Sequence, residues 1–110
     1  MIHLIDQNLE ELARQGRVEA DETMFTLPDQ EEVVLGRFER ADGVDFTIRY
    51  GRVSKRHCVI RKYQEGFYMV KDLGSTFGTF IDDIRIIHET MLMEGNRLSL
   101  GGYEYVINIT

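Results

Sequence analysis

Short hydrophobic runs follow one another from residue 24 to the end of the chain, and polar turn residues separate them. The runs are MFTL, VVLG, FTIR, HCVIRKY, GFYMVKDL, GTFI, IRII, RLSL and GYEYVINIT. The separators include Pro28-Asp29, Asp42-Gly43 and Gly101-Gly102, which are residue types that turns prefer. About nine short strands, with a turn signal roughly every 8 to 12 residues, predict an all-β fold that is an antiparallel sandwich or barrel.

Side chains alternate between two faces within several of these runs. In GFYMVKDL, Tyr68 and Val70 fall on one face of a strand, whereas Phe67 and Met69 fall on the other. Such alternation is typical of antiparallel strands that bury one face. We expect the core to draw on Val34, Ile48, Val59, Ile60, Val70, Phe80, Leu98, Leu100, Val106 and Ile107.

The beginning of the chain has a different pattern. In QNLEELARQGR, Leu9 and Leu12 lie three positions apart among strong helix formers, and Gly16 can end a helix. The run IHLI before it predicts a first strand, and the acidic residues after it predict a loop. The chain therefore divides into an N-terminal strand with an acidic helical or loop segment (1–23) and a β-rich domain (24–110).

Length and cysteine content narrow the class of protein. A chain of 110 residues is enough for one domain with one core. No apolar run approaches the roughly 20 residues of a membrane-spanning helix, and the N-terminus lacks the features of a secretory signal. The single cysteine, Cys58, excludes an internal disulfide and is typical of a reducing compartment. We expect a cytoplasmic protein, or the cytoplasmic part of a larger one, without direct membrane insertion.

Charge is distributed unevenly around a net value of −6. Residues 1–35 hold nine acidic and two basic side chains, whereas the rest of the chain holds ten acidic and eleven basic ones. Six of those bases fall between residues 37 and 56. An acidic protein with one local basic cluster argues against nucleic-acid binding, which usually needs a broad positive face. The cluster favours a small anionic ligand or a phosphorylated partner, and the alternative is a solvated surface of mixed charge.

The sequence offers no recognisable catalytic constellation. No serine sits in a nucleophile-elbow context with a paired histidine. His57 and the adjacent Cys58 point to opposite faces of a strand, so they do not share a metal easily. The loop GSTFGT lacks the Lys-Ser/Thr ending of a nucleotide-binding loop. We therefore predict no enzyme activity, no metal and no cofactor.

Three polar loops carry motifs in a fixed order. These are Gly36-Arg37, Ser54-Lys55-Arg56-His57 and Asp72-Leu73-Gly74-Ser75-Thr76-Phe77-Gly78-Thr79-Phe80, followed by the late strand Leu98-Ser99-Leu100-Gly101. In order, spacing and residue identity this set resembles the forkhead-associated (FHA) domain, from about residue 24 to residue 110. The resemblance implies an antiparallel β-sandwich of the FHA/SMAD-like type, with a short N-terminal helix or loop insertion. Its loops would bind phosphothreonine peptides at one end.

The resemblance assigns phosphate contacts residue by residue. Arg37 would bridge the phosphate and the peptide backbone, and Ser54 would donate its hydroxyl to the phosphate. Lys55 stands where the family often has a polar or basic phosphate contact. Thr76 would add a second hydroxyl. A forked guanidinium, a second cation and hydroxyl donors are the groups that a phosphate needs.

Other positions support the loops or their rim. His57 would brace the loops through internal hydrogen bonds rather than bind ligand, with Gly36 beside it in the bracing set. Gly78 would permit the tight turn of the third loop. Arg52 and Arg56 either select acidic residues that flank the phosphothreonine or merely solubilise the rim.

Phe77 departs from the family pattern. The family usually has asparagine at this position, where its amide grips the peptide main chain, and an aromatic ring cannot make that bond. Phe77 either contacts the ligand as an apolar side chain or folds inward as part of the core. Phosphate capture is compatible with both alternatives, whereas the peptide grip is weakened.

Three functional hypotheses follow. The first is a phosphothreonine-dependent protein-binding module that acts downstream of a Ser/Thr kinase. The second is a phosphate-independent structural scaffold in a larger, membrane-associated assembly. In the third, phosphorylation of Thr23 in the acidic segment lets this segment dock into the pocket of its own or a neighbouring chain, because the segment and the loops have opposite charge.

Overall fold

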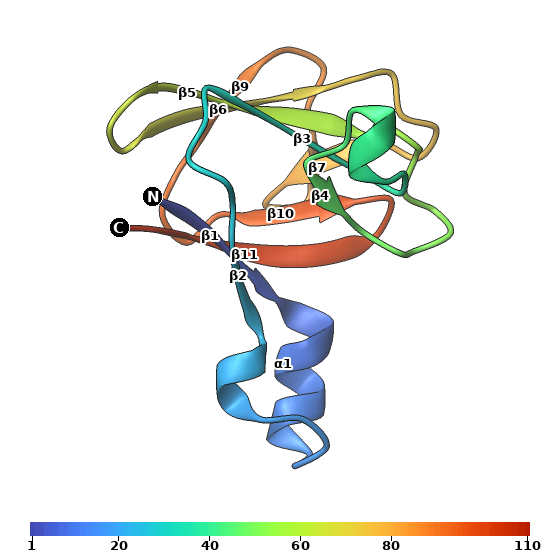
Figure 1. The fold of residues 1–110 in the computed structure, drawn as a ribbon, viewed down its shortest axis with the longest axis vertical. Coiled ribbons are helices and arrows are strands. Elements are labelled where there is room, and N and C mark those ends of the chain that lie inside the picture. The colour runs from blue at the N-terminus through green and yellow to red at the C-terminus, as the bar shows by residue number, and fades with distance from the viewer.

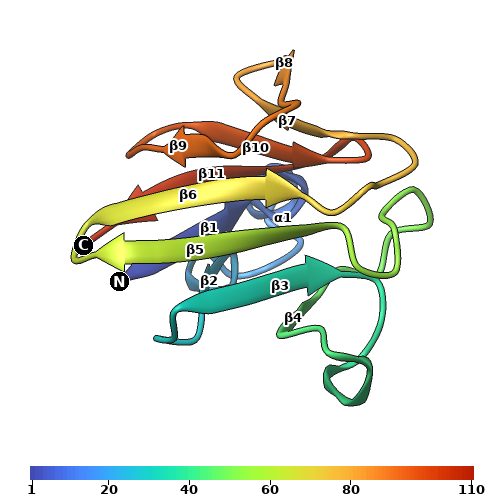
Figure 2. The ribbon, with the colours of Figure 1, turned by 90° about the horizontal axis from the view of Figure 1, so that it is seen from above.

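Two β-sheets packed face to face form the body of the molecule in the computed structural model, which describes residues 1–110 (Figures 1 and 2). The first sheet runs in the order β2 (Met24–Thr26), β1 (Ile2–Asp6), β11 (Tyr103–Ile109), β10 (Arg97–Leu100), β7 (Thr79–Ile81) and β8 (Ile84–Arg85). The second runs in the order β4 (Phe46–Thr47), β3 (Glu32–Gly36), β5 (Cys58–Gln64), β6 (Phe67–Asp72) and β9 (Thr90–Leu92). All pairs are antiparallel except β3 with β4. The predicted all-β sandwich is confirmed.

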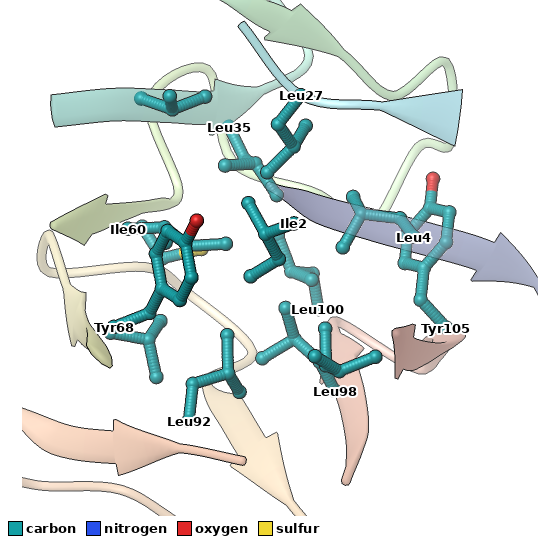
Figure 3. Close-up of a cluster of buried hydrophobic side chains, with 14 of the residues drawn as sticks. Ile2, Leu4, Leu27, Leu35, Ile60, Tyr68, Leu92, Leu98, Leu100 and Tyr105 are labelled. Carbon is teal, nitrogen blue, oxygen red and sulfur yellow. The ribbon is translucent and has the colours of Figure 1, made fainter. Parts of the chain in front are cut away.

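The core lies between the two sheets, where their inward side chains point toward one another (Figure 3). Leu4, Leu98 and Ile107 come from the first sheet, and Leu35 and Val70 come from the second; all are fully buried. Most of the predicted core is confirmed as buried, including Ile48, Val59, Ile60 and Leu100.

Three predicted core residues are only half-buried, and the strand period explains the error. Val34 lies between Val33 and Leu35, both of which point inward and are buried, so Val34 itself points outward. Phe80 and Val106 are also half-buried. A run of several apolar residues does not by itself reveal which alternate set faces the core.

A short helical insertion follows the first strand. The helix α1 (Gln7–Arg14) begins at Asp6, whose carboxylate accepts a hydrogen bond of 2.9 Å from the backbone N–H of Leu9. It ends before Gly16, which adopts a positive φ of 73°. The chain returns through the 3₁₀ turn η1 (Ala20–Glu22), and the whole insertion projects from the sandwich (Figure 1). No helix of the structure has both the length and the apolar character needed to cross a lipid bilayer.

Thr23 sits at the base of this insertion and is buried, with 3% of its surface exposed. Its hydroxyl donates a hydrogen bond of 2.7 Å to a carboxylate oxygen of Glu10. A kinase can reach this hydroxyl only if the insertion opens, because modification requires an accessible oxygen. The folded chain therefore gives no support to a phosphorylated Thr23 as a docking group.

The direction of the strands places three loops at one end of the sandwich. The strands β3 and β6 both run toward this end, and β5 begins there, so the loops 37–45, 48–57 and 73–78 emerge side by side (Figure 2). The two termini lie together at the opposite end, where the Met1 ammonium donates a hydrogen bond of 2.6 Å to the Thr110 carbonyl. The sequence motifs in the three loops are thus brought together by the fold.

Candidate functional site

A hollow of about 350 Å³ opens between the three loops. Its lining residues are Arg37, Gly51, Arg52, Val53, Ser54, Lys55, Arg56, Thr76 and Phe77. The structure thus brings together five of the six predicted peptide contacts and both predicted rim arginines. Gly78, the sixth, does not line the hollow. No carboxylate lines the hollow, so its walls carry only positive charge.

Arg37 extends into the hollow from the end of β3, and two backbone groups hold it in place. Its backbone N–H donates to the carbonyl of Ser54 at 3.0 Å, and its side-chain Nε donates to the carbonyl of Val53 at 3.0 Å. These bonds orient the guanidinium but use only one of its five N–H donors. The outer edge of the fork remains free to bind an anion.

Gly36 makes this arrangement possible because it lies directly against the second loop. A Cβ atom added at Gly36 would lie 2.2 Å from the carbonyl oxygen of Lys55 and 3.0 Å from the Cα of Arg56. The neighbouring N–H of Phe38 donates to the same Lys55 oxygen at 3.2 Å. The glycine predicted to brace the loops is therefore the point at which the backbones of the first two loops touch.

Ser54 and Thr76 connect the second and third loops. The backbone N–H of Thr76 donates to Oγ of Ser54 at 3.0 Å. This bond uses Ser54 only as an acceptor, so the hydroxyl proton of Ser54 remains available for a ligand. Thr76 is exposed and lines the hollow. Two residues that carry hydroxyl groups therefore line the same hollow as Arg37.

His57 is fully buried beneath the hollow and joins the same loops from below. Its Nδ1 accepts a hydrogen bond of 3.0 Å from the N–H of Ser54. The proton must therefore be on Nε2, which donates to the carbonyl of Gly78 at 2.9 Å. Burial lowers the pKa of His57, although the bond to Gly78 and the negative charge of Asp72 oppose this effect. The geometry is that of a neutral imidazole bracing two loops, and no ligand contact is open to it.

This arrangement predicts that the protein loses stability as the pH falls from 7 to 5. The unfolded chain binds a proton on His57 below the ordinary pKa of about 6.5, whereas the folded chain resists it, so the free energy of unfolding decreases by at most about 1.4 kcal/mol per pH unit. Protonation would also place a second N–H against the N–H of Ser54. Urea unfolding at pH 7, 6 and 5 measures the loss, and His57→Gln, which cannot titrate, is the control. Equal pH dependence in both proteins would contradict the prediction.

A second hydrogen-bond network, centred on the half-buried Asp72, shapes the third loop, and the sequence analysis does not predict it. The carboxylate of Asp72 accepts hydrogen bonds from the N–H groups of Gly74 and Ser75 and from the hydroxyls of Ser75 and Thr79. Burial tends to raise the pKa of Asp72, but the bonds from Ser75 and Thr79 outweigh it, and the pKa is lowered. The signal that could have revealed the network is the order Asp-x-Gly-Ser, a pattern in which an aspartate caps its own turn.

Two cationic side chains make cation–π contacts with aromatic rings at the rim of the hollow. The guanidinium carbon of Arg52 lies 4.4 Å from the centroid of the Phe77 ring, and Nζ of Lys55 lies 5.1 Å from that of Phe38. Phe77 is 45% exposed, so the alternative that places it in the core is wrong. Its ring instead forms a wall of the hollow.

None of the four cationic side chains in the hollow forms an ion pair. The cations of the chain that are paired are Arg14, Arg49, Arg61, Lys62 and Arg97. The hollow therefore combines unneutralised positive charge, a forked donor and two hydroxyls, which is the chemistry that binds a phosphate group.

The remaining reactive side chains lie outside the hollow. Cys58 is buried in the core, and burial raises the pKa of its thiol. His3 bonds to Thr26 and Thr110 near the chain termini. No three His, Cys, Asp or Glu side chains are grouped so that they could hold a metal ion.

Comparison with known proteins shows both a family and a fold. Residues 33–101 match the FHA domain family. An FHA domain from a structural and functional analysis of phosphothreonine-dependent FHA interactions matches with a TM-score of 0.75 at 21% identity, over 99% of this chain and 96% of that chain. An FHA domain from Chlamydia trachomatis gives a TM-score of 0.74 at 18% identity, over 100% of this chain and 99% of that chain.

A third similar structure is part of a larger protein. EmbR of Mycobacterium tuberculosis, solved in complex with a low-affinity phosphopeptide, gives a TM-score of 0.75 at 21% identity. The match covers 99% of this chain but 24% of that chain. A comparison with curated proteins finds no match. At these identities the structural likeness shows that the fold is shared.

Proposed function

Since the chain belongs to the FHA domain family, we propose that it is a binding module, not an enzyme, that captures a phosphothreonine on a partner protein. A Ser/Thr kinase would create the ligand, and the module would act downstream of that kinase. The observation that carries the proposal is the hollow itself, in which four unpaired cations and two free hydroxyls converge and no carboxylate is present.

Each group in the hollow has a specific role in this proposal. The free edge of the Arg37 guanidinium binds phosphate oxygens through two N–H groups, and Ser54 and Thr76 each donate a hydroxyl proton. Lys55 adds a second positive charge. Because a phosphate on threonine carries about two negative charges at neutral pH, cations held in place without neutralising partners bind it strongly. His57, Gly36 and Gly78 maintain the geometry of the loops.

A titration with peptides tests this function. We expect a degenerate phosphothreonine peptide library to bind with a dissociation constant in the micromolar range, about −8 kcal/mol, and the unphosphorylated library not to bind. The phosphoserine library should bind more weakly by roughly 10- to 200-fold, because one buried methyl group is missing. Equal binding of phosphorylated and unphosphorylated libraries would reject the proposal.

One observation favours the second candidate function, a phosphate-independent scaffold. Exposed apolar side chains line another hollow of about 410 Å³ between β8 and β9, among them Ile84, Ile87, Met91 and Met93. Exposed apolar surface of this kind is typical of protein–protein contacts. A partner protein that binds equally well to the Arg37→Ala variant, but not to Ile87→Asp, would favour this candidate over phosphate capture.

A further inference from the structure

The start of β11 contacts both the helical insertion (residues 7–22) and a loop of the hollow. Tyr103, the first residue of β11, donates a hydrogen bond of 2.6 Å from its hydroxyl to a carboxylate oxygen of Asp6. Its ring lies beside the ring of Tyr50 in the second loop, with 5.3 Å between the two centroids. None of these three residues lines the hollow, so any effect they have on a ligand must act through the loop.

The turn before Tyr103 is packed against the same loops. A Cβ added at Gly101 would lie 2.3 Å from the carbonyl oxygen of Arg52 in the second loop. The N–H of Gly101 also donates to the carbonyl of Gly78 in the third loop at 3.1 Å. The short segment 101–103 therefore contacts the second loop, the third loop and the base of the insertion at once.

Asp6 attaches the insertion to this segment. The residue is buried, with 4% of its surface exposed, and each oxygen of its carboxylate has a partner. One oxygen accepts the N–H of Leu9 that caps α1, and the other accepts the hydroxyl of Tyr103. Burial and the bond to Asp6 raise the pKa of Tyr103, so its hydroxyl keeps the proton that it donates. The cap of the helix and the position of the Tyr103 ring are therefore linked.

The insertion has little packing of its own. The helix α1 has eight residues, none of which is buried, and helices of this length are marginal in water without tertiary packing. Two further bonds close its base: the N–H of Asp6 donates to the carbonyl of Thr23 at 2.8 Å, and the hydroxyl of Thr23 donates to Glu10. Segments with few buried contacts open locally at a lower free energy than the whole domain. We therefore expect the insertion to have a closed and an open state.

Resting on the proposed function, we propose that the insertion regulates the phosphate site, and that Asp6, Tyr103 and Tyr50 transmit its state to the second loop. In the closed state, the Asp6 carboxylate holds the Tyr103 ring against Tyr50, and this contact keeps the second loop in the geometry that binds phosphate. Opening the insertion releases Tyr103, loosens the loop and weakens phosphopeptide binding. The three residues touch no ligand, so they are positioning residues. Because coupling between two sites is reciprocal, a bound phosphopeptide must stabilise the closed insertion by the same factor.

The experiment measures this coupling at both sites of the whole chain. Hydrogen exchange of the backbone N–H of Leu9, which bonds to Asp6, is followed by NMR with and without a saturating phosphothreonine peptide chosen from the degenerate library. The N–H of Asn96, which bonds to the Met93 carbonyl in the turn after β9, is the internal reference for stabilisation of the whole domain. This turn lies at the end of the sandwich opposite the three loops, because β9 runs antiparallel to β6. Calorimetric titration gives the affinity of the same peptide for each variant.

We expect the peptide to raise the protection of the Leu9 N–H by about fivefold or more, beyond any change at Asn96, since coupling between sites usually starts at about this factor. Tyr103→Phe removes only the hydroxyl that bonds to Asp6. It should lower the affinity by the same factor and abolish the peptide-dependent protection of Leu9. Tyr50→Leu removes the ring contact instead and should have both effects. Agreement between the two factors is a result that a merely structural role of Tyr103 would not produce.

Tyr63→Phe is the matched control for Tyr103→Phe. It also removes a tyrosine hydroxyl that donates to a carboxylate, in this case that of Glu89. Tyr63 lies near the end of β5, whereas β5 begins at the three loops, so the residue is remote from the hollow. We expect this variant to retain the affinity of the wild type and the peptide-dependent protection of Leu9.

The outcomes separate this inference from the proposed function. If the peptide binds in a phosphate-dependent way but protects Leu9 no more than Asn96, the inference is overturned and the proposed function stands. The inference also fails if Tyr103→Phe binds with full affinity, if the two factors differ, or if Tyr63→Phe reproduces the effect. If no peptide shows phosphate-dependent binding, the proposed function fails and the inference fails with it. Thermal unfolding verifies that each variant folds, and Tyr50→Leu decides the outcome if Tyr103→Phe does not.

Discussion

Replacing Arg37 with alanine is expected to abolish phosphate-dependent binding and to leave the fold intact. Removing one partner of a hydrogen-bonded charge pair costs about 2–5 kcal/mol of binding free energy, which is roughly a 30- to 5,000-fold loss of affinity. The loss of stability should be small, because Arg37 is exposed and its side chain makes one hydrogen bond, to the carbonyl of Val53. Such a bond contributes about 0.5–1.5 kcal/mol.

Two arginine variants make this prediction specific. Arg37→Lys keeps the charge but loses the fork, so its affinity should lie between those of the wild type and Arg37→Ala. Arg40→Ala removes a nearby exposed arginine that does not line the hollow, and its affinity should change little. Calorimetric titration and urea unfolding measure binding and stability separately. Full affinity in Arg37→Ala would show that the phosphate binds elsewhere.

The second large effect is expected from Gly36→Ala. The new methyl group would lie 2.2 Å from the Lys55 carbonyl oxygen, and the nearest atoms are all backbone, which cannot rotate away. Forcing the two loops apart should lower the free energy of unfolding by about 1–3 kcal/mol, the usual cost of overpacking, or more. It should also weaken phosphopeptide binding, because the N–H of Arg37 bonds to the Ser54 carbonyl across this contact.

Gly51→Ala is the matched control for this substitution. Gly51 lies in the second loop and lines the same hollow, but a Cβ there meets nothing within 4 Å, and its φ is not positive. We expect stability to be unchanged or raised by about 0.4–1 kcal/mol, because alanine restricts the unfolded chain. Urea unfolding of both variants measures the difference. If Gly36→Ala and Gly51→Ala lower the free energy of unfolding equally, close packing at Gly36 is not what holds the first two loops together.

The sheets could be predicted from the sequence because strand alternation and turn residues are local signals. Tyr68 and Val70 show this well, since the alternation predicts both on one face and both are buried. The phase of a run such as VVL is not a local signal, because every residue in it is apolar. The sequence therefore predicts Val34 in the core, whereas in the structure its two neighbours, Val33 and Leu35, are the buried residues.

The candidate site was predictable as a set of residues but not as a set of contacts. The motif spacing identified Arg37, Ser54 and Thr76, which the fold brings to one hollow. The stacking of Arg52 on Phe77 joins residues 25 positions apart, and only the approach of two loops creates it. Spacing gives the order of such residues, whereas the direction of each side chain depends on the packed loops.

The pairing of the two chain ends has a mechanical consequence. β1 and β11 are antiparallel, with Ile2 opposite Ile109 at the open end and Asp6 opposite Tyr105 at the other. Tension applied through Met1 and Thr110 would break the residue pairs between β1 and β11 one after another, as in unzipping, rather than all at once. Each residue pair is held by only a few hydrogen bonds, so β1 should separate from β11 at low force. The rupture would start at the end of the sandwich opposite the three loops that surround the hollow.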